Sequence, residues 1–335
     1  RRSLLLEPGR GTVLSNLATL YAHATDDPRA LLWFRRASKA APLRADHWAR
    51  QASCAIRLGR NAEAHTCLKQ ACVLAPADPV HWEHYGTLLR RMTRRADAER
   101  SVRNGLLFCP EAGRLWSSLS ATLLEVDNIP AALLYGRRAT IAAPAESEAF
   151  GNLAQAQYRS GQIDAAISSG AQTMRLDPQN PTITLNLAIY LLTKGDLAHG
   201  WPLYEARLIP LRKMTRNLPA QPWTPEIAGP DVHLLVYAEQ GLGDEVMFGT
   251  CFPELKERLS AGDLGSVTVE CTDRLRSLFE RSFPAFRFFD RIRKQEQRLH
   301  PADYETTVRT HGCTHHVAAG SLPKFFRSTL SHFPD

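Results

Sequence analysis

The segment at 150–178, FGNLAQAQYRSGQIDAAISSGAQTMRLDP, decides the fold, because its pattern recurs along most of the chain. It combines a large residue at its start, a small residue four positions later, an alanine in its second half and a terminal proline. Equivalent residues recur every 34 positions, which is typical of stacked helical units. The prolines are Pro8, Pro42, Pro76, Pro110, Pro144 and Pro178; the large positions are Leu14, Trp48, Trp82, Trp116, Phe150 and Thr184; the small ones are Ala18, Ala52, Gly86, Ser120, Ala154 and Ala188; the alanine positions are Ala30, Ala64, Ala98, Ala132, Ala166 and Gly200.

Each unit is a helix pair too small to bury its own apolar face, so it depends on its neighbours. Small residues let the helices approach closely, the large residue fills the space between repeats, and proline ends the second helix. Gly59, Gly161 and Gly195 fall where the first helix turns into the second, as expected of a helix terminus. The pattern resembles the tetratricopeptide repeat (TPR) family. It predicts six first helices and six second helices in an all-α superhelix over residues 11–210.

Residues 1–10 extend this pattern towards the N-terminus. Pro8 is the terminal proline of a repeat whose body is absent, and no initiator Met begins the chain. We therefore expect residues 1–10 to be the remnant of a preceding repeat in a longer protein.

The composition of the 335 residues, 44% hydrophobic and 22% charged, is that of a globular protein with room for two domains. The formal charge of +7 permits an acidic partner but does not require nucleic acid, and none is expected. No apolar run approaches the ~20 residues of a membrane span, so none is predicted. The seven cysteines form no CxxC pair, which predicts reduced, mostly buried thiols in a cytoplasmic protein.

The first helices of a TPR superhelix line a concave groove, where a peptide or protein partner is expected. Two residues after each large position stand Asn16, Arg50, His84, Ser118, Asn152 and Asn186. The triplet NLA at 16–18, 152–154 and 186–188 resembles the repeats of O-GlcNAc transferases, in which an asparagine ladder holds the backbone of an extended peptide. An amide side chain suits this task because it both donates and accepts hydrogen bonds. The resemblance implies a peptide-binding role for Asn16, Asn152 and Asn186, in a ladder that the other three residues interrupt.

A second set of groove candidates lies nine residues after the large positions. Three of these six residues are arginines, Arg57, Arg91 and Arg159, which suggests a basic stripe for an acidic peptide. The alternative is that they are solvated helix ends, where a cation interacts favourably with the helix dipole.

The periodicity changes after residue 210. Residues 211–231 contain a proline-rich stretch that reads as a linker, and 232–335 reads as an α/β domain. Strands are predicted at 233–238, 266–271 and 286–290 and, less regularly, at 302–308. Helices are predicted at 244–260, kinked at Pro253, and at 273–283. Strand–helix–strand alternation predicts a parallel sheet with right-handed crossovers.

The loop AEQGLGDE at 238–245 joins the first strand to the first helix. It lacks the third glycine of a dinucleotide-binding fingerprint, and Asp244 would repel a pyrophosphate. The Gly-Lys-Ser/Thr of a Walker loop is also absent. One interpretation of Asp244 is a helix N-cap, whose carboxylate accepts backbone N–H bonds.

The other interpretation comes from a resemblance. The stretch AEQGLGDEVMFGTCFPEL at 238–255 is similar to the first strand–loop–helix of heptosyltransferase-type GT-B glycosyltransferases, and especially to bacterial proteins that join TPR repeats to such a half-domain. WPLYEARL, the PW at 222–223 and SLPKFF at 321–326 fit that joined family. The resemblance implies a Rossmann-like N-terminal half of a GT-B domain over 232–335. It also implies that Asp244 is the general base, that Gly241 and Gly243 hold acceptor or phosphate oxygens, and that Glu239 and Gln240 contact a sugar.

The resemblance further implies that a nucleotide-sugar donor binds in a second Rossmann-like domain, of which residues 1–335 show no segment. The chain itself is expected to carry no cofactor. Two hypotheses follow: part of a protein-modifying glycosyltransferase with a sugar acceptor, or a non-enzymatic TPR scaffold with a degenerate glycosyltransferase-like domain.

The cluster RTHGCTHHVAAG at 309–320 contains four residues able to ligate a metal. They crowd together without the spacing of a structural zinc site, so a solvated loop is expected and no metal site is assigned. The residues are His311, Cys313, His315 and His316.

Overall fold

The computed structural model describes residues 11–209, 218–291 and 301–333, and divides into two compact units, Arg1–Asp177 and Pro178–Asp335. The remnant predicted at 1–10 and part of the predicted linker, 210–217, lie outside the described residues.

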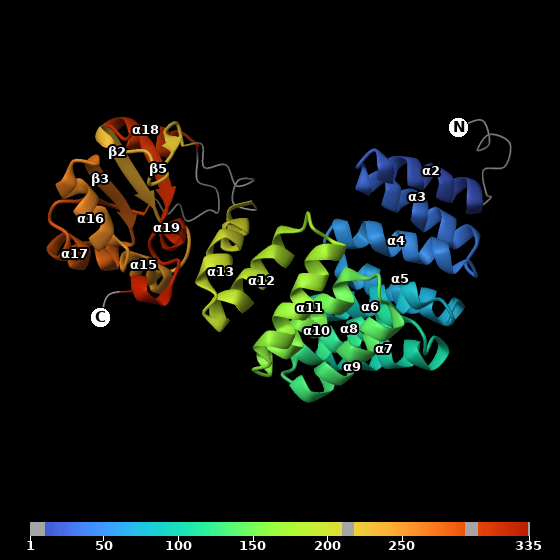
Figure 1. Cartoon of the computed structure of the whole chain (residues 1–335). Helices are drawn as coiled ribbons and strands as arrows, with labels where there is room; N and C mark the ends of the chain where they lie inside the picture. Colours follow the sequence, from blue (N-terminus) through green and yellow to red (C-terminus); the bar gives the residue numbers. More distant parts are fainter. Residues whose placement is uncertain (1–10, 210–217, 292–300, 334–335) are drawn as a thin grey trace. The chain divides into compact units, whose positions relative to one another are not determined.

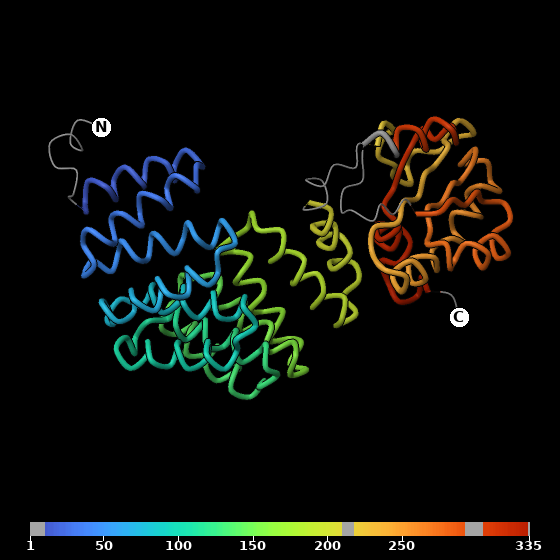
Figure 2. The backbone as a smooth tube through the Cα atoms, turned by 180° about the vertical axis from the view of Figure 1, so that it is seen from behind, coloured from blue at the N-terminus to red at the C-terminus, as the bar shows by residue number. Residues whose placement is uncertain are grey.

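The described part of the first unit is a series of helix pairs (Figures 1 and 2). The first helices α6, α8 and α10 pack directly on one another, and each second helix packs against the first helix of its own pair. The first helices are α2 (Gly11–His23), α4 (Ala45–Arg57), α6 (Pro79–Arg91), α8 (Gly113–Glu125) and α10 (Ser147–Arg159); the second helices are α3 (Asp27–Ala40), α5 (Asn61–Leu74), α7 (Arg95–Phe108), α9 (Ile129–Ala142) and α11 (Ile163–Leu176).

The small positions of the repeat are where the helices meet. Ala18, Ala52 and Ala154 are buried almost completely. At Gly86 an added Cβ would come within 2.6 Å of Cγ2 of Val102, so even alanine would require a shift. The predicted packing role of these positions is confirmed.

The recurrent tryptophan and proline are linked by a hydrogen bond that the repeat analysis did not foresee. The indole N–H of Trp48, Trp82 and Trp116 donates to the backbone carbonyl of the proline six residues earlier, at 2.8 Å in each case. Each tryptophan therefore fixes the turn that enters its own helix pair, in addition to filling space.

In every pair, one residue of the turn from the first to the second helix has a left-handed backbone conformation. Gly59, Gly161 and Gly195 have φ of 71°, 79° and 88°, as predicted. Thr25, Thr93 and Asp127 occupy the equivalent positions with φ of 58°, 59° and 62°. The backbone geometry thus recurs every 34 residues even where the residue is not glycine.

The second unit begins with a sixth helix pair, so all six pairs predicted from the 34-residue repeat are present. It continues into a five-stranded parallel sheet of order β1-β5-β2-β3-β4. Its elements are α12 (Pro181–Lys194), α13 (Leu197–Tyr204), η1 (Glu205–Arg207), β1 (Gln221–Pro222), β2 (Gly229–Tyr237), α15 (Leu242–Gly249), α16 (Phe252–Ala261), β3 (Leu264–Cys271), α17 (Asp273–Ser282), β4 (Arg287–Asp290), α18 (Pro301–His311), β5 (His315–Ala318), η2 (Ala319–Ser321), α19 (Leu322–Phe326) and η3 (Leu330–His332).

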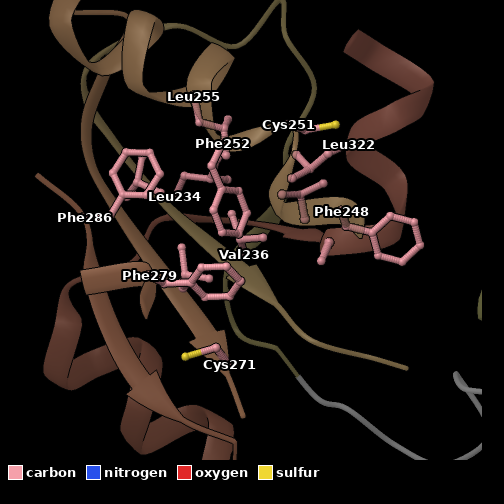
Figure 3. Packing of buried hydrophobic residues seen from close by; sticks show 14 of the residues in the cluster. Leu234, Val236, Phe248, Cys251, Phe252, Leu255, Cys271, Phe279, Phe286 and Leu322 are labelled. Atoms are coloured by element: carbon pink, nitrogen blue, oxygen red, sulfur yellow. The ribbon is translucent and has the colours of Figure 1, made fainter. Parts of the chain in front are cut away.

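The main core of the second unit lies on one face of this sheet (Figure 3). Leu234 and Val236 of β2 meet Phe248 of α15, Phe252 of α16 and Phe279 of α17. Residues 234 and 236 point to the same face because side chains alternate along a strand. Leu235 points to the other face and packs with Val308 and Cys313.

Three details of the predicted α/β region are corrected. Residues 302–308 are helical, within α18, because Tyr304 and Val308, one helical turn apart, are both buried. The strand that was predicted at 302–308 is replaced by β5, which pairs with β2 and lies where a solvated loop was predicted. The helix predicted at 244–260 is two helices, and Pro253 lies in the first turn of the second, where its missing N–H costs nothing.

Candidate functional site

The carboxyl edge of the sheet contains the best candidate site of the second unit. After β2 the chain crosses to β3 and β4 on one side and later returns to β5 on the other side of β2. The strand order therefore reverses between the neighbouring strands β2 and β5. In open parallel sheets, ligands bind outside the carboxyl ends of strands at such a point.

Asp244 lies in the first turn of α15, which begins at Leu242. Its Oδ2 accepts the backbone N–H of Gly241 at 2.9 Å. Gly241 is the N-cap, so the interpretation of Asp244 as the N-cap residue is wrong by three positions, because the helix begins earlier than predicted. Glycine has no side chain to return a hydrogen bond, so only the carboxylate half of a capping box exists.

Gly241 and Gly243 are exposed on this loop. Neither has a left-handed backbone, and an added Cβ at Gly243 would meet no atom within 4 Å. The fold therefore does not require glycine at position 243, although its absent side chain leaves the backbone of the first turn accessible.

Glu239 is buried and paired. Its Oε1 lies 2.7 Å from Nη2 of Arg207 and accepts the backbone N–H of Gly320 at 3.0 Å. Oε2 is buried without a hydrogen-bond partner in the described part of the chain. Glu239 thus ties η1 and η2 to the end of β2, and direct sugar contact by this residue stays a prediction.

Gln240 is half-buried and bonds through its side chain to the hydroxyl of Tyr204, with contacts of 2.9 and 3.1 Å. Burial raises the pKa of Tyr204. The amide of Gln240 is therefore held in place by the end of α13, which orients the loop.

Two further buried carboxylates, Glu245 and Glu270, were missed from the sequence. Glu245 accepts both the backbone N–H and the hydroxyl of Thr272, each at 2.7 Å. Glu270 accepts the backbone N–H of Ala238 at 3.0 Å and the hydroxyl of Tyr304 at 2.8 Å. A glutamate within the otherwise apolar run SVTVEC was the available signal for Glu270. Both glutamates fix the loop between β2 and α15.

A cavity of about 470 Å³ opens beside the ends of β2 and β5. Its walls combine aromatic rings with groups that can donate or accept hydrogen bonds, which suits a polar ligand with flat faces. The Nδ1 atom of His316 is buried there without a hydrogen-bond partner in the residues described, and burial lowers the pKa of this imidazole. The lining includes the rings of Trp223, Tyr237 and Phe325 and the polar side chains of His316, Ser321 and Lys324.

The four residues of the 309–320 cluster do not converge. The ring of His311 stacks on Phe289, with centroids 5.6 Å apart, and Cys313 is buried in the small core around Leu235. His315 and His316 are consecutive on β5, so their side chains leave opposite faces of the sheet. Among the described residues, no three or more His, Cys, Asp or Glu side chains are placed together to hold a metal ion.

The three asparagines of the predicted ladder lie on first helices and differ in their surroundings. Asn16 and Asn186 are exposed, and their amides are accessible. Asn152 is half-buried and donates to the backbone carbonyl of Ser117 at 3.3 Å and to its hydroxyl at 2.9 Å. It therefore joins two adjacent first helices.

The arginines of the predicted basic stripe also differ. Arg57 pairs with Asp27 at 2.6 Å, and Arg159 pairs with Asp127 at 2.8 Å, in each case reaching the preceding repeat. Arg91 is exposed and has no ionic partner among the residues described. It borders a hollow of about 200 Å³ between α4 and α6, together with His84, which is one of the ladder positions.

The cysteines are free, six of them buried and Cys109 half-buried, as predicted. Burial raises the pKa of Cys67, Cys72, Cys251 and Cys271 to about 12, so these thiols are protonated at neutral pH. Among the described helices, none is long and apolar enough to cross a bilayer.

No protein-family model matches the chain. Protein FlbA of Caulobacter vibrioides (strain ATCC 19089 / CIP 103742 / CB 15) is 34% identical to it over 182 residues, which are 52% of this chain and 29% of FlbA. The chain thus spans less than a third of the length of this relative.

Three solved structures resemble the helical part of the chain. The Cut9 and Hcn1 hetero-tetramer of the APC/C has a TM-score of 0.54 at 15% identity, covering 61% of this chain and 41% of the other. The type IV pilus biogenesis factor PilW has a TM-score of 0.52 at 20% identity, covering 61% and 94%. Pseudomonas aeruginosa pilF has a TM-score of 0.51 at 17% identity, covering 60% and 92%. These likenesses establish a TPR-type fold, which is consistent with a protein-binding scaffold.

Proposed function

We propose that this chain belongs to a glycosyltransferase that modifies proteins. Its repeats bind the acceptor protein, and residues 232–335 form the acceptor side of the sugar-transfer site. The observation that carries the proposal is the accessible Gly241–Asp244 turn at the point of the sheet where ligands bind in open parallel sheets.

The sheet supports a Rossmann-like half of a GT-B fold. Apart from the two-residue β1, the strands lie in the chain order fourth, first, second, third, which is that of the first four strands of a doubly wound sheet. The chain spans less than a third of FlbA, so a second half that binds the nucleotide-sugar donor elsewhere in a longer protein is part of the proposal.

Asp244 is proposed as the general base. Oδ2 is held by the Gly241 N–H, which leaves Oδ1 to accept a proton from the acceptor hydroxyl. As that hydroxyl oxygen forms a bond to the anomeric carbon, the bond from this carbon to the donor phosphate breaks, and the nucleoside diphosphate leaves. The N–H groups of the first turn of α15 are proposed to bind an oxygen of the acceptor or phosphate.

The test compares Asp244→Asn with Asp244→Ala in the full-length protein in its source cells. Asparagine can still accept the Gly241 N–H but cannot take a proton, whereas alanine loses both functions. We expect both variants to abolish glycosylation of the cellular acceptor, measured by intact-protein mass, and only alanine to reduce the thermal stability. Unchanged glycosylation by Asp244→Asn would contradict the proposal.

Gly243→Ala gives an independent control on the same loop. The substitution meets no neighbouring atom and adds a better helix former, so the fold should keep or gain stability. If acceptor or phosphate oxygens approach the first turn, the added methyl group should lower transfer by at least about tenfold, roughly 1.4 kcal/mol in the barrier.

The second candidate function is a non-enzymatic scaffold. It is favoured by the buried carboxylates Glu239, Glu245 and Glu270, all of which bind protein donors and stabilise the loop. A scaffold predicts that a strain carrying Asp244→Asn keeps its glycoproteins unchanged.

The groove is tested separately with the acceptor protein, identified as a protein that loses its glycan in the Asp244→Asn strain. Asn16→Ala and Asn186→Ala should weaken its binding without loss of helicity, because these amides are exposed. Asn152→Ala should instead lower stability, because its amide links two helices. Equal binding by wild type and the Asn16→Ala/Asn186→Ala variant would remove the ladder from the proposal.

A further inference from the structure

Three consecutive second helices of the first unit expose an aliphatic residue at the same repeat position. Val73 of α5, Leu107 of α7 and Ile141 of α9 are 66%, 79% and 81% exposed, and they are 34 residues apart. The same position holds Lys39 in the preceding repeat and Arg175 in the following one. We call Val73, Leu107 and Ile141 the second-helix stripe. Helices α5, α7 and α9 are labelled in Figure 1.

A row of cations accompanies the stripe one helical turn earlier. Lys69, Arg103 and Arg137 are all exposed and lie four residues before the stripe residues, hence on the same helix faces. Arg103 pairs with Glu99 within its own helix. For Lys69 and Arg137, no acidic partner occurs in the part of the chain that the structure describes.

Between α5 and α7 the surface is hollowed, with a volume of about 420 Å³. Val73 and Lys69 lie on its α5 side, and the rings of Trp82 and Tyr85 belong to its lining. Asp97 bridges two further cations there, pairing with Arg94 at 2.7 Å and also with Arg100. The hollow therefore combines aromatic surface with a basic border.

We propose that the second-helix stripe, with its cations and this hollow, is a docking surface for an acidic amphipathic segment of a partner protein. Its apolar side chains would cover Val73, Leu107 and Ile141, and one would enter the hollow over Trp82. Its carboxylates would meet the cationic row. Charge complementarity selects the occupant, because the cations of the row outnumber their acidic partners and a basic segment would be repelled.

This surface is distinct from the first-helix hollow at His84 and Arg91, which lies between α4 and α6. The proposal does not depend on glycosyl transfer, since it rests on the helices of the repeats alone. Exposed aliphatic residues scattered singly need no explanation, but three at one repeat position, with charged residues at that position in the flanking repeats, form a recurrent feature.

The test uses a fluorescein-labelled synthetic peptide with leucine at helical spacing and glutamate at the other positions. A control peptide has lysine in place of each glutamate. Binding to the full chain is measured by fluorescence anisotropy for wild type, Leu107→Asp and Leu43→Asp. Leu43 is the matched control, because it is 82% exposed and lies outside the stripe.

We expect the acidic peptide to bind and Leu107→Asp to weaken it at least about tenfold, since an anchor residue is lost. Leu43→Asp should change binding less than about twofold, because it lies outside the stripe. Raising the salt from about 0.05 M to about 0.5 M should weaken binding, because screening reduces attraction between exposed charges. The double reversal Lys69→Glu/Arg137→Glu should exchange the preference towards the basic peptide.

Three results of the binding experiment would overturn the proposal. They are no binding of the acidic peptide, equal or tighter binding of the basic peptide to wild type, and equal effects of Leu107→Asp and Leu43→Asp. Sedimentation showing dimers that Leu107→Asp dissociates would also overturn it, in favour of a second copy as the occupant. Circular dichroism of each variant establishes that helicity is retained.

Discussion

Replacing Thr93 with glycine is expected to stabilise the protein. Thr93 is the turn residue between α6 and α7 and has φ of 59°, a region that L-residues with a branched side chain rarely adopt. The same turn is made by glycine at positions 59, 161 and 195. The repeat therefore contains its own reference for an unstrained residue.

The magnitude follows from two opposing terms. A left-handed conformation costs an L-residue about 1–2 kcal/mol. Glycine opposes the gain by about 0.5–1 kcal/mol, because its unfolded chain has more freedom. The hydroxyl of Thr93 donates to the carbonyl of Met92 at 2.7 Å, but this bond is exposed and contributes little. The net expectation for Thr93→Gly is a stabilisation of about 0.5–1 kcal/mol.

The assay is urea unfolding monitored by circular dichroism, with the same dependence of unfolding free energy on urea concentration for all variants. Two matched variants are included. Thr93→Ala removes the hydroxyl but keeps a Cβ, so it should not reproduce the gain. Gly59→Ala places a Cβ in the same conformation, with no atom within 4 Å to collide with, and should destabilise. Adding Thr25→Gly, two repeats away, should contribute a similar gain independently.

The reasoning is refuted if Thr93→Gly lowers the unfolding midpoint. It is equally refuted if Thr93→Ala stabilises as much as Thr93→Gly, since the effect would then come from the side chain rather than from the backbone conformation.

Three further perturbations test other contacts. Trp82→Phe should lower the free energy of unfolding by about 2 kcal/mol, because it removes the hydrogen bond from the indole N–H to the carbonyl of Pro76 and leaves space in the repeat interface. The unfolding midpoint measures this loss, and an unchanged midpoint would contradict the turn-fixing role. Tyr304→Phe should lower the free energy of unfolding by about 1.5–3 kcal/mol, because it removes a hydrogen bond to the buried carboxylate of Glu270. Calorimetry measures this loss, and a loss no larger than that of a substitution at an exposed position would contradict the prediction. The hydrogen bond from Arg57 lowers the pKa of Asp27 below its ordinary value of 3.8. The pair therefore stabilises the fold above pH 3.8, and this contribution is lost as the pH falls through the lowered pKa. The difference in unfolding free energy between wild type and Asp27→Asn should shrink on acidification, and a constant difference would exclude the linkage.

The amides and arginines of the predicted groove show how far the sequence could assign function within a repeat. Spacing alone assigned Asn16, Asn152 and Asn186 to one repeat position. Only the structure shows that the amide of Asn152 is hydrogen-bonded to Ser117. Arg57 and Arg159 likewise reach acids 30 and 32 residues earlier, whereas Arg91 stays accessible. A periodic pattern identifies equivalent positions but not which neighbours their side chains have.

The sequence by itself determined the helix pairs, their turns and the packing positions, because a solenoid repeat contacts mainly its neighbours and the same contacts recur every 34 residues. It also located β2, β3 and β4 from their apolar runs. It could not decide that 302–308 is helical or that β5 joins the sheet beside β2, since β5 pairs with a strand about 80 residues earlier. The loop at 239–244 shows the same division. Its composition marked it as a candidate site, but the tertiary structure alone placed Arg207 against Glu239 and, just after the loop, Thr272 against Glu245, contacts between segments 32 and 27 residues apart. Such partners are set by how the sheet and its helices pack, and no local pattern in the chain encodes them.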